Sequence, residues 1–185
     1  MPALEAAAQA LPGHAEPPFR LGTIAGLRGE VARAEAYFHA ALARDPQHVP
    51  ALAALAALEE EAGRIDSAAA RIAQARLLDP QEPELEVAAA RLALRLNDLP
   101  AAIANAEAVL ASRPAHAGAA RLLARALLRR DGSEAALVDV ATRAAADPSA
   151  AGLAVAAAEL ARRRRAAPGC AGGTPRCRDA GAGCG

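Results

Sequence analysis

Apolar residues recur along this chain at steps of three and four, which is the spacing of one face of an α-helix. Near the amino end, for example, Leu21 and Ala25 are followed by Ala34, Phe38 and Ala41. The sequence has no run of alternating β-branched residues that would indicate a strand. The pattern therefore predicts an all-α protein.

Two kinds of helix break divide this pattern at regular intervals. Proline lacks the amide hydrogen that a helix interior needs, and it disfavours helical dihedral angles in the residue before it. Prolines recur at a constant spacing, at Pro46, Pro80, Pro114 and Pro148. Between them lie turn-forming residues that suit the end of a helix, at Gly29, Gly63, Asn97 and the pair Asp131-Gly132. The breaks therefore predict two helices in each 34-residue repeat.

The breaks also define the expected elements. We expect helix pairs at residues 17–28 with 31–44, 49–62 with 65–78, 83–96 with 99–112, and 117–130 with 133–146. They form four repeats over residues 17–148, with boundaries at about 15–48, 49–82, 83–116 and 117–148. A terminal helix within residues 149–165 is expected to cap the last repeat. Residues 1–16 are interpreted as an N-terminal segment and linker, and residues 166–185 as a disordered tail rich in Gly, Pro and Cys.

Small residues occupy corresponding positions in all four repeats. In the second helices this position always holds alanine, at Ala34, Ala68, Ala102 and Ala136. We expect these alanines to face small residues of the first helices, which are Gly22, Ala56, Ala90 and Ala124. A larger side chain at such a contact would force the two backbones apart.

The repeat resembles the tetratricopeptide repeat, which is a 34-residue helix-turn-helix unit. The first repeat matches best, with residues of the family's small, turn and capping positions at Leu21-Gly22, Ala25, Gly29, Ala34, Phe38, Ala41 and Asp45-Pro46. The position where the family often has Tyr holds Ala25, Glu59, Ala93 and Leu127. The resemblance implies an all-α, right-handed α-solenoid of four helix-turn-helix repeats followed by a C-terminal capping helix.

The resemblance also implies where a partner would bind, because in this family the first helix of each repeat lines a concave groove. The inward-facing positions near the amino end hold Phe19, Thr23 and Leu27. Those nearer the carboxyl end include Arg91, Arg95, Arg121, Arg125 and Arg129. Such a groove is apolar at one end and basic at the other, and its basic end suits acidic side chains or a terminal carboxylate. The alternative is that these arginines only keep an exposed face soluble, since like charges four residues apart on a helix repel.

The composition restricts the expected cellular location of the protein and the class of partner that it binds. Acidic and basic residues balance at 21 each, so the net charge gives no indication of a nucleic acid or an anionic membrane as partner. Apart from the histidines every basic residue is arginine, which with abundant Ala, Gly and Pro is typical of GC-rich bacterial coding sequences. Residues 1–20 contain neither a signal-peptide pattern nor a membrane span. We therefore expect a bacterial, cytoplasmic protein.

No catalytic or metal-binding motif stands out. The histidines form no metal-binding pair, and they are His14, His39, His48 and His116. The spacing of Cys170, Cys177 and Cys184 matches no zinc motif, although a soft-metal or redox role is an alternative. The run Glu59-Glu60-Glu61 is interpreted as a solvated helix end rather than an acid–base centre. We therefore expect no enzyme activity, no catalytic residue, no cofactor and no metal.

The function expected from these observations is that of a protein–protein interaction module or scaffold, which binds a peptide or a partner protein with an acidic segment. One alternative is that the repeats belong to a larger bacterial enzyme of the sulfotransferase, glycosyltransferase or aspartyl/asparaginyl hydroxylase type, whose catalytic domain is missing from this chain. A third hypothesis is that the basic run 162–165 is a docking patch for RNA, an acidic protein or lipid headgroups, and RNA binding is disfavoured because no aromatic residue lies beside the run for base stacking. The sequence specifies neither the partner nor the oligomeric state.

Overall fold

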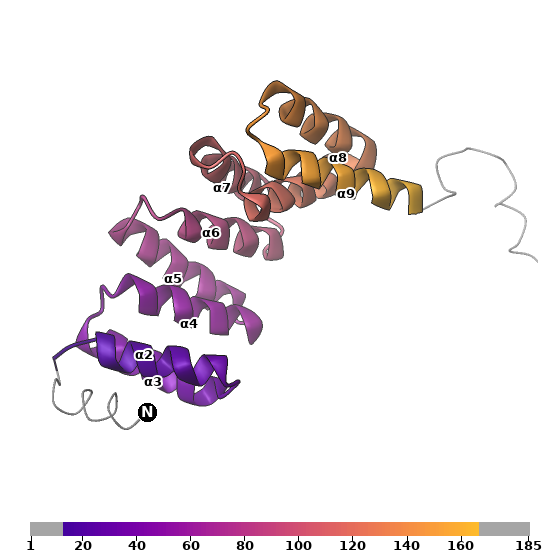
Figure 1. Ribbon diagram of the computed structural model, residues 1–185. Helices are drawn as coiled ribbons and strands as arrows, with labels where there is room; N and C mark the ends of the chain where they lie inside the picture. The colour runs from indigo at the N-terminus through magenta and orange to yellow at the C-terminus, as the bar shows by residue number, and fades with distance from the viewer. Residues whose placement is uncertain (1–12, 167–185) are drawn as a thin grey trace, which may run out of the picture.

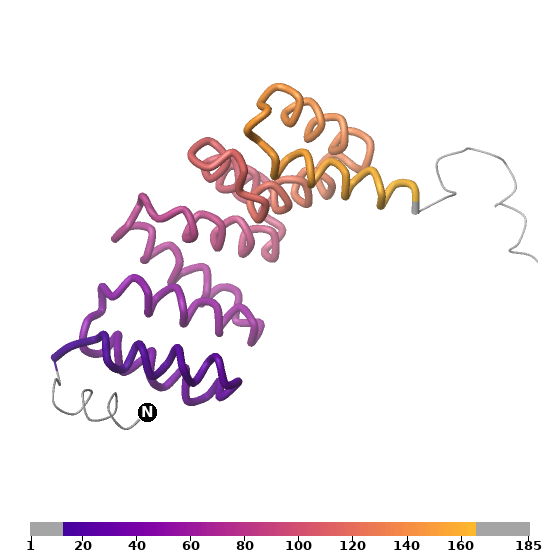
Figure 2. The backbone as a smooth tube through the Cα atoms, in the orientation of Figure 1, coloured from indigo at the N-terminus to yellow at the C-terminus, as the bar shows by residue number. Residues whose placement is uncertain are grey.

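The computed structural model describes residues 13–166, which form only α-helices joined by short turns (Figure 1). The helices are, in order, α2 (Glu16–Leu27), α3 (Val31–Arg44), α4 (Val49–Glu61), α5 (Ile65–Leu78), α6 (Pro83–Arg95), α7 (Leu99–Ser112), α8 (Ala117–Ala146) and α9 (Ala151–Ala166). Figure 2 shows the chain reversing at each turn, so that helix pairs stack one after another along an elongated array. The expected α-solenoid is confirmed.

The paired helices begin and end within one residue of the expected ranges, except in the fourth pair. There the two expected helices form one element, α8, which is kinked at Gly132 with φ 81° and ψ 176°. In the three earlier turns, the residue with a left-handed φ lies one position earlier in the repeat than Gly132 does. At Asn97, for example, φ is 60°. The expected linker and tail lie largely outside the described residues, and the division into domains stays a prediction.

Hydrogen bonds of aspartate side chains explain why Asp precedes Pro in three of the four turns. Asp45 and Asp147 each accept a hydrogen bond from the backbone amide two residues later, at 2.9 and 2.8 Å. Asp79 does the same at 3.3 Å. The hydroxyl of Ser149, and then its amide, hold the pKa of the Asp147 carboxyl below its ordinary value, because both donate hydrogen bonds that stabilise its charged form. Each such contact satisfies an amide where the chain leaves one repeat and enters the next.

Two of the histidines cap helices. Nδ1 of His48 accepts a hydrogen bond from the amide of Ala51 at 3.2 Å, and Nδ1 of His116 accepts one from Ala119 at 3.0 Å. These amides belong to the first turns of α4 and α8, where a helix has donors without partners in its own backbone. Both histidines therefore have a structural task at the start of a first helix.

The core is a continuous seam of alanine and leucine between successive helices. The alanines of the four small positions in the second helices are all fully buried, and they are Ala34, Ala68, Ala102 and Ala136. In the first repeat a large side chain lies beside one of the small residues. A Cβ atom at Gly22 would lie only 2.6 Å from the ring of Phe38, whereas Ala34 lies against Gly26, with 4.0 Å between its Cβ and a Cβ at that glycine. The ring of Phe38 is therefore the nearest neighbour of Gly22, and the expected pairing of Gly22 with Ala34 stays a prediction.

We predict that replacing Ala68 by leucine lowers the free energy of unfolding by about 1–3 kcal/mol, because the larger side chain has to fit against Ala56 and Ile72 in the α4–α5 core. Ala70→Leu is the matched control, since Ala70 is exposed on the same helix, and it should change stability by less than about 0.5 kcal/mol. Urea unfolding followed by circular dichroism measures both. Equal transition midpoints for the two variants would contradict the packing of α5.

A second pair of variants tests the contact of Gly22 with Phe38. Alanine is the better helix former by about 0.5–1 kcal/mol, so Gly26→Ala, which meets only an ordinary contact, should leave the protein equally or more stable. Gly22→Ala should instead destabilise it, because the new methyl group overlaps the ring of Phe38. Thermal unfolding compares the two. A Gly22→Ala variant as stable as Gly26→Ala would show that α2 and α3 are less closely packed than described.

Candidate functional site

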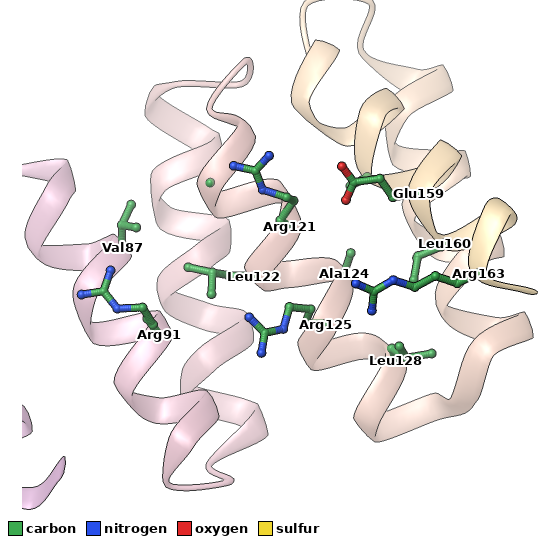
Figure 3. Close-up of a pocket in the computed structure, with 12 residues that line it drawn as sticks. Val87, Arg91, Arg121, Leu122, Ala124, Arg125, Leu128, Glu159, Leu160 and Arg163 are labelled. Atoms are coloured by element: carbon green, nitrogen blue, oxygen red, sulfur yellow. The ribbon is translucent and has the colours of Figure 1, made fainter. Parts of the chain in front are cut away.

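A hollow of about 460 Å³ opens between α6, the first half of α8 and α9 (Figure 3). Part of its lining is apolar and includes Val87, Leu122, Leu128 and Leu160. The charged side chains that line it are Arg91, Arg121, Arg125, Glu159 and Arg163. The hollow therefore combines apolar surface with an excess of positive charge.

The 34-residue register brings the three walls of this hollow together. α6, α8 and α9 begin at Pro83, Ala117 and Ala151, so that they occupy the first-helix position in successive repeats. On α8 the side chains of Arg121 and Arg125 lie one turn apart and face the same side. The hollow is thus the carboxyl-terminal part of the surface that the first helices form together.

Three arginines of the hollow have no ion-pair or hydrogen-bond partner within residues 13–166. Arg121, Arg125 and Arg163 are exposed, and no hydrogen bond or ion pair links any of them to another residue of the part of the chain that the structure describes. Glu159, which is half-buried, faces the same hollow from α9. A guanidinium group can bind a carboxylate through two parallel hydrogen bonds, and these side chains are free to do so.

Arg91 differs from these three because it is already paired. Its Nε donates to both carboxylate oxygens of Glu60, at 3.0 and 2.7 Å. The carboxylate belongs to α4, one repeat earlier, so the ion pair links neighbouring first helices. Arg91 borders the hollow, but its charge is largely neutralised there.

Arg95 and Arg129 do not line the hollow. Nη1 of Arg95 donates to the backbone carbonyl of Glu60 at 2.8 Å, and Nη1 of Arg129 donates to that of Leu94 at 2.6 Å. Both bonds reach back to the carboxyl end of the preceding first helix, where carbonyl groups lack partners within their own helix. These two arginines therefore link successive repeats through hydrogen bonds. Their role in partner binding stays a prediction.

The acidic run in α4 is not the solvated helix end that the sequence suggested. Only 4% of the surface of Glu59 and 8% of that of Glu60 is exposed. Nε of Arg71 lies 2.9 Å from both carboxylate oxygens of Glu59, while Glu60 is paired with Arg91. That interpretation is wrong for Glu59 and Glu60, because arginines from neighbouring helices pair with the two carboxylates and allow their burial.

The expected groove residues near the amino end lie apart from this hollow. Phe19 is half-buried, with ring centroids 5.9 Å from Phe38 and 5.0 Å from His48, so it packs between the first two repeats. The hydroxyl of Thr23 donates to the carbonyl of Phe19 at 3.1 Å. Leu27 is 85% exposed at the end of α2. A role in partner binding stays a prediction for these three residues.

Sequence reasoning missed the wall that α9 provides. Glu159, Leu160 and Arg163 line the hollow, whereas the sequence suggested a capping helix there, with the basic run 162–165 as an alternative docking patch and no link to the groove. The signal was present, because α9 begins one full repeat after α8, which places Glu159 and Arg163 in register with Arg125 and Arg129. A terminal helix in register with the repeats continues their shared surface.

Neither a membrane-spanning helix nor a metal-binding cluster is found in the described part of the chain. Within residues 13–166, no helix combines the length and the apolar character needed to cross a bilayer. In the same range, no three His, Cys, Asp or Glu side chains are grouped so that they could hold a metal ion. The residues Cys170, Cys177 and Cys184 lie outside the described range.

The comparisons with known proteins identify the repeat. Residues 27–92 match the sequence model of the tetratricopeptide repeat family. No curated protein matches the chain as a relative. Among solved structures, the protein YrrB, described as a tetratricopeptide-repeat protein with an unusual peptide-binding site, is 16% identical with a TM-score of 0.69, and the match covers 88% of this chain and 84% of that one.

Two further solved structures share the fold at similarly low identity. The hetero-tetramer Cut9–Hcn1 of the APC/C contains a chain that is 18% identical with a TM-score of 0.69, over 87% of this chain and 32% of that one. A thermophilic tetratricopeptide-repeat protein of Thermus thermophilus is 20% identical with a TM-score of 0.60, and the match covers 86% of this chain and 87% of that one. The sequence match identifies residues 27–92 as tetratricopeptide repeats, and the solved structures show that the described array shares the fold of tetratricopeptide-repeat proteins.

Proposed function

We propose that this chain is a protein-interaction module, and that the hollow between α6, α8 and α9 binds an acidic segment of a partner protein or peptide. The proposal rests on one observation. Arg121 and Arg125 lie side by side over apolar surface, exposed and without an ion-pair or hydrogen-bond partner among residues 13–166. Other arginines of the first helices, such as Arg91, Arg95 and Arg129, donate to a carboxylate or a carbonyl group, whereas Arg121 and Arg125 do not.

An acidic ligand would relieve the repulsion between these two side chains. Like charges four residues apart on a helix destabilise it by about 0.2–0.5 kcal/mol, so Arg121 and Arg125 cost stability when the hollow is empty. A ligand with two carboxylates removes this repulsion and gains charge-assisted hydrogen bonds. Its apolar side chains would gain further free energy against Leu122, Leu128 and Leu160. Together these effects favour a short segment that combines acidic and apolar residues.

The similar structures support a binding function by analogy of fold. One of them is described as having a peptide-binding site, and another is seen in a complex of two different proteins. They are only 16% and 18% identical to this chain, so neither specifies a partner for it. The cytoplasmic location, the bacterial origin and the hypothesis of a larger enzyme also stay predictions.

The test uses an acidic hexapeptide of sequence ELEELE, labelled with fluorescein, and its uncharged counterpart QLQQLQ. We predict that fluorescence anisotropy shows saturable binding of the acidic peptide alone. The double variant Arg121→Glu with Arg125→Glu should weaken binding by at least about tenfold, because each reversal replaces an attraction by a repulsion. Circular dichroism should stay unchanged, since both side chains are exposed.

A matched control separates the site from the overall charge. Arg28→Glu with Arg162→Glu changes the net charge equally, and both side chains are exposed, lie outside the hollow and have no partner within residues 13–166. This control should bind the peptide nearly as well as the original protein. If both double variants lose affinity equally, the peptide responds only to total charge and the hollow is not the site.

A further inference from the structure

A hydrogen bond that recurs between successive repeats is missing at the last one. Arg95 donates to the carbonyl of Glu60, and Arg129, at the same position of the next repeat, donates to that of Leu94. Arg163 is the next residue in this register, and the corresponding carbonyl is that of Leu128. Arg163 makes no such bond among the described residues, and its side chain lines the hollow instead.

The amino end of α9 packs more closely against the array than its carboxyl end does. At the amino end Gly152 is buried against α8, and a Cβ there would lie 3.2 Å from the carbonyl oxygen of Ala115 and from backbone atoms of Ala117. Farther along, Leu160 is buried in the core. Beyond it, the polar contact between α9 and the rest of the described chain is one exposed ion pair, from Arg164 to Glu134 at 3.4 Å. Exposed ion pairs contribute little to stability, so the carboxyl end of α9 is the weakly held end.

The charges around the hollow weaken this end further. Arg163 extends from α9 toward Arg125 of α8, as Figure 3 shows, and Arg121 lies one turn away from Arg125. None of the three is in an ion pair within residues 13–166, and Glu159 is the one acidic residue that lines the hollow with them, so their net repulsion opposes the contact of α9 with α8. An anionic group between the two helices would turn this repulsion into attraction on both sides.

We infer that Arg163 is a ligand-binding residue, and that an acidic segment lying between Arg125 and Arg163 fastens α9 to the array. The ligand then supplies the polar link that Arg95 and Arg129 make directly in the preceding repeats. Glu159 lies one turn before Arg163 on the same wall, so its negative charge favours anionic groups at the Arg163 end of the hollow. This inference rests on the proposed function, and it adds α9 as part of the binding site rather than only a cap.

The test compares two neighbouring arginines of α9. Arg163→Glu reverses a charge inside the hollow, whereas Arg162→Glu makes the same change at an exposed residue that does not line it. Anisotropy with labelled ELEELE should show at least about tenfold weaker binding for Arg163→Glu and less than about threefold for Arg162→Glu. Equal effects of the two variants would overturn the role of Arg163.

Hydrogen exchange provides a second measurement, and a purely structural role of Arg163 would not make its result depend on the peptide. Saturating ELEELE should slow amide exchange along α9 in the original protein by at least about tenfold, because a fastened helix opens less often. The conservative variant Arg163→Gln should bind the peptide more weakly and show no such slowing at equal occupancy. Slowing that is unchanged in Arg163→Gln would overturn the inference.

The outcomes separate this inference from the proposed function. If Arg121→Glu with Arg125→Glu abolishes binding while Arg163→Glu leaves it intact, the hollow binds the peptide without α9, and only the further inference fails. If the original protein does not bind ELEELE at all, both proposals fail. Slowing of exchange by sodium sulfate at equal ionic strength, to the same extent as by the peptide, would show a counter-ion effect and would also overturn the inference.

Discussion

The close approach of helices at positions that hold only alanine or glycine is the constraint on which this structure depends. Ala34, Ala68, Ala102 and Ala136 are fully buried, and each lets a second helix pack directly against a first helix. Because this contact recurs in every 34-residue repeat, the first helices line up on one side of the array. The hollow between α6, α8 and α9 is a consequence of this alignment, since a change of register would place its arginines on different faces.

The pairing of charges distinguishes structural arginines from the candidate binding residues. Arg71 and Arg91 neutralise the buried carboxylates of Glu59 and Glu60, and Arg95 and Arg129 donate to carbonyl groups of the preceding repeat. Acidic residues outnumber basic ones in residues 13–116, and the reverse holds in residues 117–166. Apart from Arg28, the arginines without a partner among residues 13–166 lie at the end of the described array where basic residues outnumber carboxylates.

Local signals in the sequence predicted where the helices begin and end. Contacts between residues far apart in the sequence determine which charged side chains are buried and which line the hollow. Proline, glycine and asparagine mark the ends of the paired helices closely, because their effects on the backbone are local. The burial of Glu60 could not be predicted in this way, since Arg91 and Arg95 lie on a helix of the next repeat. Within the site, the register predicted Arg121 and Arg125, but it was applied only to the four repeats and so left Arg163 outside the predicted groove.

Selection from a displayed library of random peptides would show, without bias toward any one ligand, whether the hollow prefers acidic segments. The original protein and the variant Arg121→Glu with Arg125→Glu would be used as parallel baits, with enriched peptides compared by sequencing. We expect the original protein to enrich peptides with two or more acidic residues beside apolar ones, and the variant not to do so. Enrichment of the same peptides by both baits, or of peptides without acidic residues by the original protein, would contradict the binding role assigned to the hollow.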